Sequence, residues 1–285
     1  MPSPFNRILL ATEGTEFDSG AERVGIDLAA SCGVPLWAVL PLVSNSEYES
    51  LAPELEERAE AEAAAIIDKL KQAANARGVE FSGTVRLGEE PFREIVDEAR
   101  ERHTDLIVLR RRGKRSYLAN LLLGEMVHTV TGHAHCDVLT VPRAAQLWSR
   151  AIVLATDGSP HSDRATAVAA ALAVCYGLPL TVVSVVEPRD GQVADNSAAK
   201  VNVERALTVV RAAGAQATGR VVAGGKPYDA ILAAAAETSA DLIVIGRRGL
   251  NRVERIMVGS TSERVAGSAN SPVLIVQQAA SAAAR

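Results

Sequence analysis

The sequence has few cysteines and aromatic residues and no excess of basic ones. Its three cysteines, Cys32, Cys136 and Cys175, lie far apart without a CxxC pair, which argues against a disulfide framework or zinc ribbon and favours a reducing, cytoplasmic location. No apolar run approaches the roughly 18 residues that span a bilayer, and the start turns polar too soon for a signal peptide, so membrane insertion is not expected. With 30 Lys and Arg against 34 Asp and Glu, nucleic acid is not an expected partner.

The chain of 285 residues repeats itself, and this repeat predicts its organisation. The second copy follows the first at an offset of 144 residues near the start, which falls to 135 near the end. The matching pairs are 7–15 with 151–159, 104–109 with 240–245, and 137–141 with 272–276. We therefore expect two homologous domains, 1–146 and 147–285.

Each half alternates short apolar runs with helical patterns. In the second half the expected strands are 151–155, 180–186, 217–222, 241–245 and 273–276, and the expected helices are 162–175, 198–213, 227–237 and 260–268. The runs are apolar at consecutive positions, as in strands buried on both faces. In the first half, residues 53–77 predict one long surface helix. The alternation predicts an α/β fold with a doubly wound parallel sheet in each half.

Three polar turns of the second half are expected at the carboxyl edge of its sheet, where such folds bind ligands. They are 156–159, 246–249 and 259–263. Gly246 and Gly249 would permit positive φ and close approach of a ligand, and Gly259 with Ser260 would present a helix start to an anion. Each feature also has an ordinary structural interpretation. Asp157 and Ser159 could cap a helix, Ser260 and Glu263 could form a capping box, and the glycines could mark tight turns.

Taken together, the spacing Gly246-x2-Gly249-x9-Gly259-Ser260-Thr261 resembles the G-2x-G-9x-G(S/T) signature of ATP-binding universal stress proteins, the UspA superfamily. The resemblance covers residues 5–142 and 150–278, so the whole chain is similar to a tandem universal stress protein. It implies two Rossmann-like domains of the adenine nucleotide alpha hydrolase-like type. It also implies that the halves pair as an intramolecular pseudo-dimer, with a homodimer possible.

The resemblance implies a role for each residue that matches the motif. Asp157 would bind the base and sugar, and the backbone of Val185 would meet adenine. Ribose and phosphates would be held by Gly246, Arg247, Gly249, Gly259, Ser260 and Thr261. Mg²⁺ or Mn²⁺ would accompany the phosphates, because it needs few protein ligands. The nucleotide is expected to be ATP, with AMP and cyclic AMP left open.

The first half departs from this pattern at several positions. Glu13 replaces Asp157, Pro41 stands opposite Val185 without an N–H, and Arg110 replaces Gly246. Ten residues instead of nine separate Gly113 from Gly124, and Glu125-Met126 replaces Ser260-Thr261. A carboxylate at a phosphate-binding helix start repels the ligand. We expect no ATP in this half and one nucleotide per chain.

Other candidate groups are interpreted as structural. His128, His133, His135 and Cys136 lack zinc-finger spacing and are expected to form an ordinary helix and turn, although their role is not fixed by the sequence. The basic run 110–115 is expected to be a solvated loop or a partner contact. His161 is expected in an exposed first helical turn. No catalytic residue and no protein metal ligand is evident.

The preferred hypothesis is a cytoplasmic, ATP-binding stress-response protein that acts as a nucleotide-dependent switch on an unknown protein partner. One alternative is an enzyme that slowly hydrolyses ATP or phosphorylates itself. Another is a nucleotide-free scaffold in which both halves serve only assembly.

Overall fold

The computed structural model describes residues 3–44, 53–111, 124–186, 196–249 and 258–278. The chain divides into two compact α/β units, one within residues 5–147 and the other from residue 148 onward. No helix within the described ranges has both the length and the apolar character needed to cross a bilayer.

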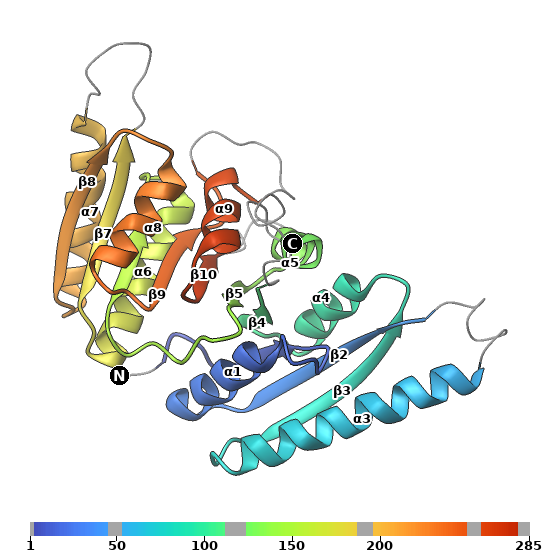
Figure 1. The fold of residues 1–285 in the computed structure, drawn as a ribbon. Helices are drawn as coiled ribbons and strands as arrows, with labels where there is room; N and C mark the ends of the chain where they lie inside the picture. Colours follow the sequence, from blue (N-terminus) through green and yellow to red (C-terminus); the bar gives the residue numbers. More distant parts are fainter. Residues whose placement is uncertain (1–2, 45–52, 112–123, 187–195, 250–257, 279–285) are drawn as a thin grey trace, which may run out of the picture. The chain divides into compact units, whose positions relative to one another are not determined.

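The first unit is a parallel sheet with helices on both faces (Figure 1). Its elements are β1 (Ile8–Ala11), α1 (Ser19–Cys32), β2 (Leu36–Val43), α3 (Pro53–Asn75), β3 (Phe81–Gly88), α4 (Pro91–Glu101), β4 (Leu106–Arg110), α5 (Glu125–His133) and β5 (Asp137–Val141). The strand order is β3-β2-β1-β4-β5. The chain therefore reverses direction across the sheet at β1, which makes the gap between β1 and β4 the topological switch point.

The second unit repeats this architecture. Its elements are β6 (Ile152–Ala155), α6 (Pro160–Tyr176), β7 (Leu180–Val186), α7 (Ser197–Ala212), β8 (Ala217–Ala223), α8 (Pro227–Glu237), β9 (Leu242–Gly246), α9 (Ser260–Ser268) and β10 (Val273–Val276). The strand order is β10-β9-β6-β7-β8, all parallel. Helices α6 and α7 pack together on one face and α8 and α9 on the other (Figure 1).

The predicted fold class is confirmed, and the central strands show why the pattern was informative. All four residues of β6 and of β10 are buried, as expected for strands covered on both faces. Four elements of the second unit have the expected bounds: strands 180–186 and 273–276 and helices 227–237 and 260–268. The other elements of the second unit differ from the expected bounds by one or two residues at their ends. Helix α3 ends at Asn75, two residues before the expected end.

The register of the second sheet brings the ends of three strands to one edge. Ala155, the last residue of β6, lies opposite Ile245 of β9 and Val183 of β7. The segments that follow β6 and β9 therefore leave the sheet side by side, at the switch point where ligands bind in folds of this class.

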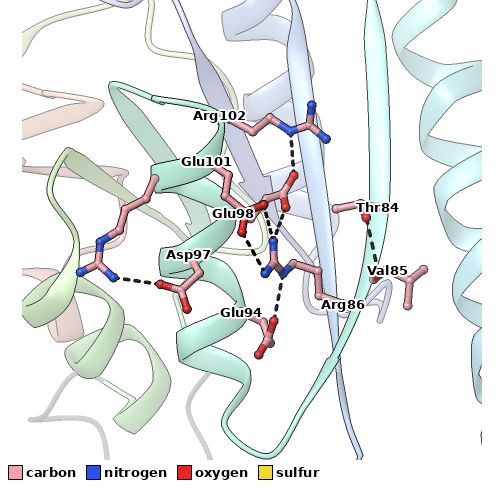
Figure 2. A network of polar contacts seen from close by, with 9 residues as sticks. Thr84, Val85, Arg86, Glu94, Asp97, Glu98, Glu101 and Arg102 are labelled. Carbon is pink, nitrogen blue, oxygen red and sulfur yellow. Dashed lines mark hydrogen bonds and ion pairs between the residues drawn. The ribbon is translucent and has the colours of Figure 1, made fainter.

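A cluster of charged side chains joins β3 to α4 in the first unit (Figure 2). Arg86 of β3 donates to Glu94 at 2.9 Å, to Glu98 at 2.8 Å and to Glu101 at 2.9 Å. Glu98 has a 4% exposed side chain and also accepts from Arg102 at 2.9 Å. These carboxylates hold the pKa of Arg86 above its ordinary value, with Glu101 the largest contributor.

Replacing Arg86 by methionine should destabilise the first unit, because it leaves the buried Glu98 carboxylate with one cationic partner fewer. We expect a loss of about 1–3 kcal/mol in the free energy of unfolding, measured by urea denaturation. The control is Arg58→Met, which removes an exposed ion pair with Glu62 and should change stability by at most about 0.5 kcal/mol. Equal effects of the two substitutions would contradict this account.

Candidate functional site

The turn after β6 begins the candidate site in the second unit. Gly158 has φ +78°, a conformation that L side chains rarely adopt, which allows the chain to turn sharply from β6 into α6. The Ser159 hydroxyl caps α6 by accepting from the Ser162 N–H at 3.2 Å. The Ser159 N–H donates to the Asp157 carboxylate at 3.0 Å. Ser159 therefore has the expected capping role, and it also orients Asp157.

Asn202 of α7 is a member of this site that the sequence analysis missed. Its amide donates to the Asp157 carbonyl at 3.0 Å, and its side chain fills the place where a Cβ on Gly158 would lie. The repeat contained the signal, because Ile66 occupies the equivalent position of the first unit and packs on Gly14 in the same way. A polar residue in the second copy where the first has an apolar one could have indicated that this position belongs to the site.

Gly246 and Gly249 are required here for space rather than for backbone conformation. Neither has a positive φ, so that expectation is wrong. A Cβ on Gly246 would lie 2.8 Å from the His161 carbonyl carbon, and a Cβ on Gly249 would lie 2.5 Å from Asp157 Oδ2. The two glycines therefore let α6 and the Asp157 carboxylate pack directly against the segment after β9.

The start of α9 contacts the end of β9 and the segment that follows it. Gly259 is the N-cap residue with φ −66°, and its N–H donates to the Arg247 carbonyl at 2.8 Å. The buried Ser262 hydroxyl donates to the Gly246 carbonyl at 2.7 Å. Ser260 and Thr261 are the first two residues of the helix, so their N–H groups have no partner within it. The expected capping box of Ser260 and Glu263 is wrong, because the N-cap is a glycine, which has no side chain to accept a hydrogen bond.

Two arginines concentrate positive charge at this edge. Arg248 is 8% exposed, and its carbonyl accepts from the Ser159 hydroxyl at 3.4 Å. Burial, together with the neighbouring charge of Arg248, lowers the pKa of Arg247 to about 10. Burial also lowers the pKa of Arg248. Both side chains remain cationic at neutral pH, in a place where their positive charge is poorly solvated, so an anion would be attracted there.

Val185 lies at the same edge of the sheet. It stands two residues beyond Val183, the partner of Ala155, so its backbone extends past the end of β6. Its side chain is partly exposed. Most of the residues expected to bind nucleotide lie on segments that contact one another: Asp157, Gly246, Arg247, Gly249 and Gly259. Val185 lies on β7, the strand paired with β6.

The equivalent place in the first unit is filled by Arg110. Its guanidinium donates to Glu13 at 2.6 Å and to the Thr15 hydroxyl at 3.0 Å, and it lies 3.5 Å from the buried Asp18 carboxylate. The expectation that this arginine belongs to a solvated loop is therefore wrong. Arg111 is half-buried, and residues 112–115 of the basic run lie outside the described residues.

The structure describes two of the remaining departures of the first unit, Glu125 and Pro41. Glu125 is the first residue of α5 and is exposed, where the second unit has Ser260. Pro41 lies in β2 opposite Arg86 of β3. Gly113 lies outside the described residues.

The histidines near Cys136 do not gather around a common point. The His133 ring contacts Phe92, with 5.3 Å between centroids, and its Nδ1 lies 2.8 Å from the Thr129 carbonyl. Burial raises the pKa of the Cys136 thiol to about 12, so this cysteine is unreactive. Within the described ranges, no three His, Cys, Asp or Glu side chains come together as a metal site.

A cavity of about 300 Å³ lies between α1 and α3 of the first unit. Glu22 lines it, accepts from the Thr12 hydroxyl at 2.8 Å, and has a pKa raised mainly by burial. Asp27 and Arg77 also line it and pair with each other.

In the second unit, Arg205 of α7 donates a hydrogen bond to Asp163 of α6 and so connects the two helices.

Comparison with known proteins identifies the class of protein that this fold and site define. The model of the universal stress protein family matches residues 4–142 and again 149–277. The chain therefore belongs to the universal stress protein family and contains two copies of its domain in tandem. This confirms the resemblance inferred from the glycine motif.

Individual relatives agree with this assignment. A universal stress protein of Thermus aquaticus is 41% identical over 136 residues, which are 45% of this chain and 98% of that protein. The universal stress protein YxiE of Bacillus subtilis is 28% identical over 149 residues, 48% of this chain and 99% of that protein. The crystal structure of a universal stress protein from Archaeoglobus fulgidus shares the fold, with a TM-score of 0.77, 23% identity and 96% of each chain covered.

Substituting Gly246 by alanine should destabilise the second unit, because the new Cβ would lie 2.8 Å from α6 backbone that cannot rotate away. We expect a loss of about 1–3 kcal/mol in the free energy of unfolding. In Gly249→Ala, the matched control, the Cβ meets only the end of the Asp157 side chain. That substitution should cost less, since the carboxylate can rotate. Urea denaturation of both variants checks the order, and a costlier Gly249→Ala would refute it.

Proposed function

We propose that this universal stress protein binds one adenine nucleotide, ATP in the first instance, at the carboxyl edge of the second sheet. One observation carries the proposal: the N-terminal ends of α6 and α9 both pack against Gly246, next to Arg247 and Arg248. The Gly246 backbone touches α6 at His161 and α9 through Ser262. Both helix starts and both arginines favour an anion there.

Each residue of the motif has a role in this proposal. The N–H groups at the start of α9, with the hydroxyls of Ser260 and Thr261, hold the phosphates, and Arg247 balances their charge. The Asp157 carboxylate accepts from a ribose hydroxyl or the base, and the Val185 backbone meets adenine. Mg²⁺ or Mn²⁺ would neutralise phosphate charge when bound, with few protein ligands.

The first unit does not bind nucleotide in this proposal. Arg110 takes the volume that the ligand would need, and its charge is already balanced by Glu13 and Asp18. Glu125 would place a negative charge at the start of α5, where the phosphates would lie. Residues 1–146 are thus the domain with a degenerate motif, and residues 147–285 the domain with an intact one.

The biological role that fits such a site is a stress-response switch. Nucleotide binding at the start of α9 would shift the population of a surface used by a protein partner. A cytoplasmic location and pairing of the two domains as a pseudo-dimer belong to the same proposal.

Two measurements test the binding. Mass spectrometry of the small molecules released on denaturing the purified chain should identify an adenine nucleotide. Titration calorimetry with ATP on ligand-free protein should give a stoichiometry of one per chain. Two equivalent sites would refute the asymmetry of the domains, and neither co-purified nucleotide nor binding would refute the proposal itself.

The substitution Ser260→Glu should weaken nucleotide binding while the fold remains intact. It copies Glu125 into the second unit and places a carboxylate beside the phosphates. It is also tolerated at an exposed first helical position, because acidic residues stabilise helix N-termini. We expect affinity for ATP to fall at least about tenfold, which is about 1.4 kcal/mol.

The matched control for Ser260→Glu is Ser197→Glu, at the exposed first residue of α7. This variant makes the same change of charge at a helix start outside the site and should bind ATP like the wild type. If both variants bound equally well, the start of α9 would not hold the phosphates.

A further inference from the structure

His161 lies at the point where the charged elements of the proposed site meet. It is the second residue of α6, and its backbone and Cβ lie 2.8 and 3.0 Å from the place of a Cβ on Gly246. It is partly buried, which corrects the expectation of an exposed first turn. The same glycine anchors the first turn of α9 through Ser262. A phosphate bound at the start of α9 would therefore share the surroundings of His161.

The charges on the elements around His161 are mostly positive. Burial is the largest cause of its lowered pKa, followed by Arg247 and then Arg248, both in the segment after β9, while Asp157 in the turn before α6 opposes them. Its charged neighbours on α6 are engaged elsewhere: Asp163 accepts from Arg205 at 2.6 Å, and Arg164 donates to the Gln277 carbonyl at 2.6 Å. The first turn of α9 adds the carboxylate of Glu263.

We propose that His161 takes up one proton from solvent when the nucleotide phosphate binds beside Arg247 and Arg248, and that its imidazolium then balances part of the phosphate charge. This inference rests on the proposed function and adds a pH-dependent regulation to that site. The new N–H bond on the imidazole forms as a hydronium ion or buffer acid from solution gives up its proton, and no other bond changes.

The direction of the pH dependence follows from linkage. Without nucleotide, the pKa of His161 lies below its ordinary value, so the ring is neutral at pH 7 and above. A bound phosphate offsets the charges of Arg247 and Arg248 and raises this pKa. Affinity then increases as the pH falls through the pKa of the complex, and it levels off below the pKa of the free protein. One proton changes affinity by at most about tenfold per pH unit.

Calorimetric titration with ATP at pH 6, 7 and 8 tests the inference on the full chain. The comparison is between wild type, His161→Asn and the control His103→Asn. His103 is an exposed residue of the first unit with φ 51°, which asparagine tolerates. The terminal phosphate of ATP also titrates in this range, and it does so equally with all three proteins. The ratio of Kd at pH 8 to Kd at pH 6 should be about three- to tenfold larger for wild type and the control than for His161→Asn.

A second measurement needs no variant to fold. The imidazole resonance of His161 in wild type, followed by NMR against pH, should give a higher pKa with ATP bound than without it. An unchanged imidazole pKa, or the same pH ratio in wild type and His161→Asn, would overturn the inference and leave the proposed function standing. Absence of ATP binding to wild type at every pH would instead overturn the proposed function, and this inference with it.

Discussion

The missing side chain at Gly246 is the constraint on which the site of the second unit depends. It lets α6 begin at Pro160 and pack its first turn against the end of β9. In the first unit Arg110 stands at this position, and α1 begins only at Ser19, which at the offset of 144 corresponds to Asp163. The helix thus starts three positions later, and a guanidinium lies near its start. The two units therefore differ both in where this helix begins and in whether a side chain lies at the end of the strand.

The difference between Gly246 and Arg110 also changes how charge is balanced in the two copies. In the first unit the cation and its counter-charges all belong to the protein, since Arg110 meets Glu13 and Asp18. In the second unit Arg247 and Arg248 stand beside two helix starts, and the Asp157 carboxylate in the turn before α6 accepts from the Ser159 N–H. The burial that lowers the pKa of Arg247 makes its charge costly, so an anion from outside would stabilise it.

Much of the fold could be predicted because its signals are local or repeated. The consecutive apolar runs and the internal repeat define the strands, and Gly158 and Ser159 define the turn into α6. The contacts of the site were less accessible, since they join residues far apart in the sequence. The glycine motif suggested that positive φ was needed at Gly246 and Gly249, whereas the structure shows a need for space. The spacing reveals that a side chain is absent, but not that the His161 backbone and the Asp157 carboxylate lie where a Cβ would stand. Asn202 lies on α7, the helix after α6. The only sign in the sequence that it belongs to the site is that the first copy has Ile66 at the equivalent position.

The two copies also differ in what their stability depends on. The first unit carries a second internal network, in which Arg86 and Glu98 stand where the repeat has Val222 and Ala234. The buried Glu98 carboxylate of this network is paired within the protein, with Arg86 and Arg102. The second unit has apolar residues at those two positions, and it carries the cationic Arg247 and Arg248 at the edge where its strands end. An anion that binds this edge in the folded state alone stabilises that unit by mass action. The two copies of the domain thus balance charge differently: the first does so with its own carboxylates around Arg110, and the second, in the proposed function, does so with a bound anion.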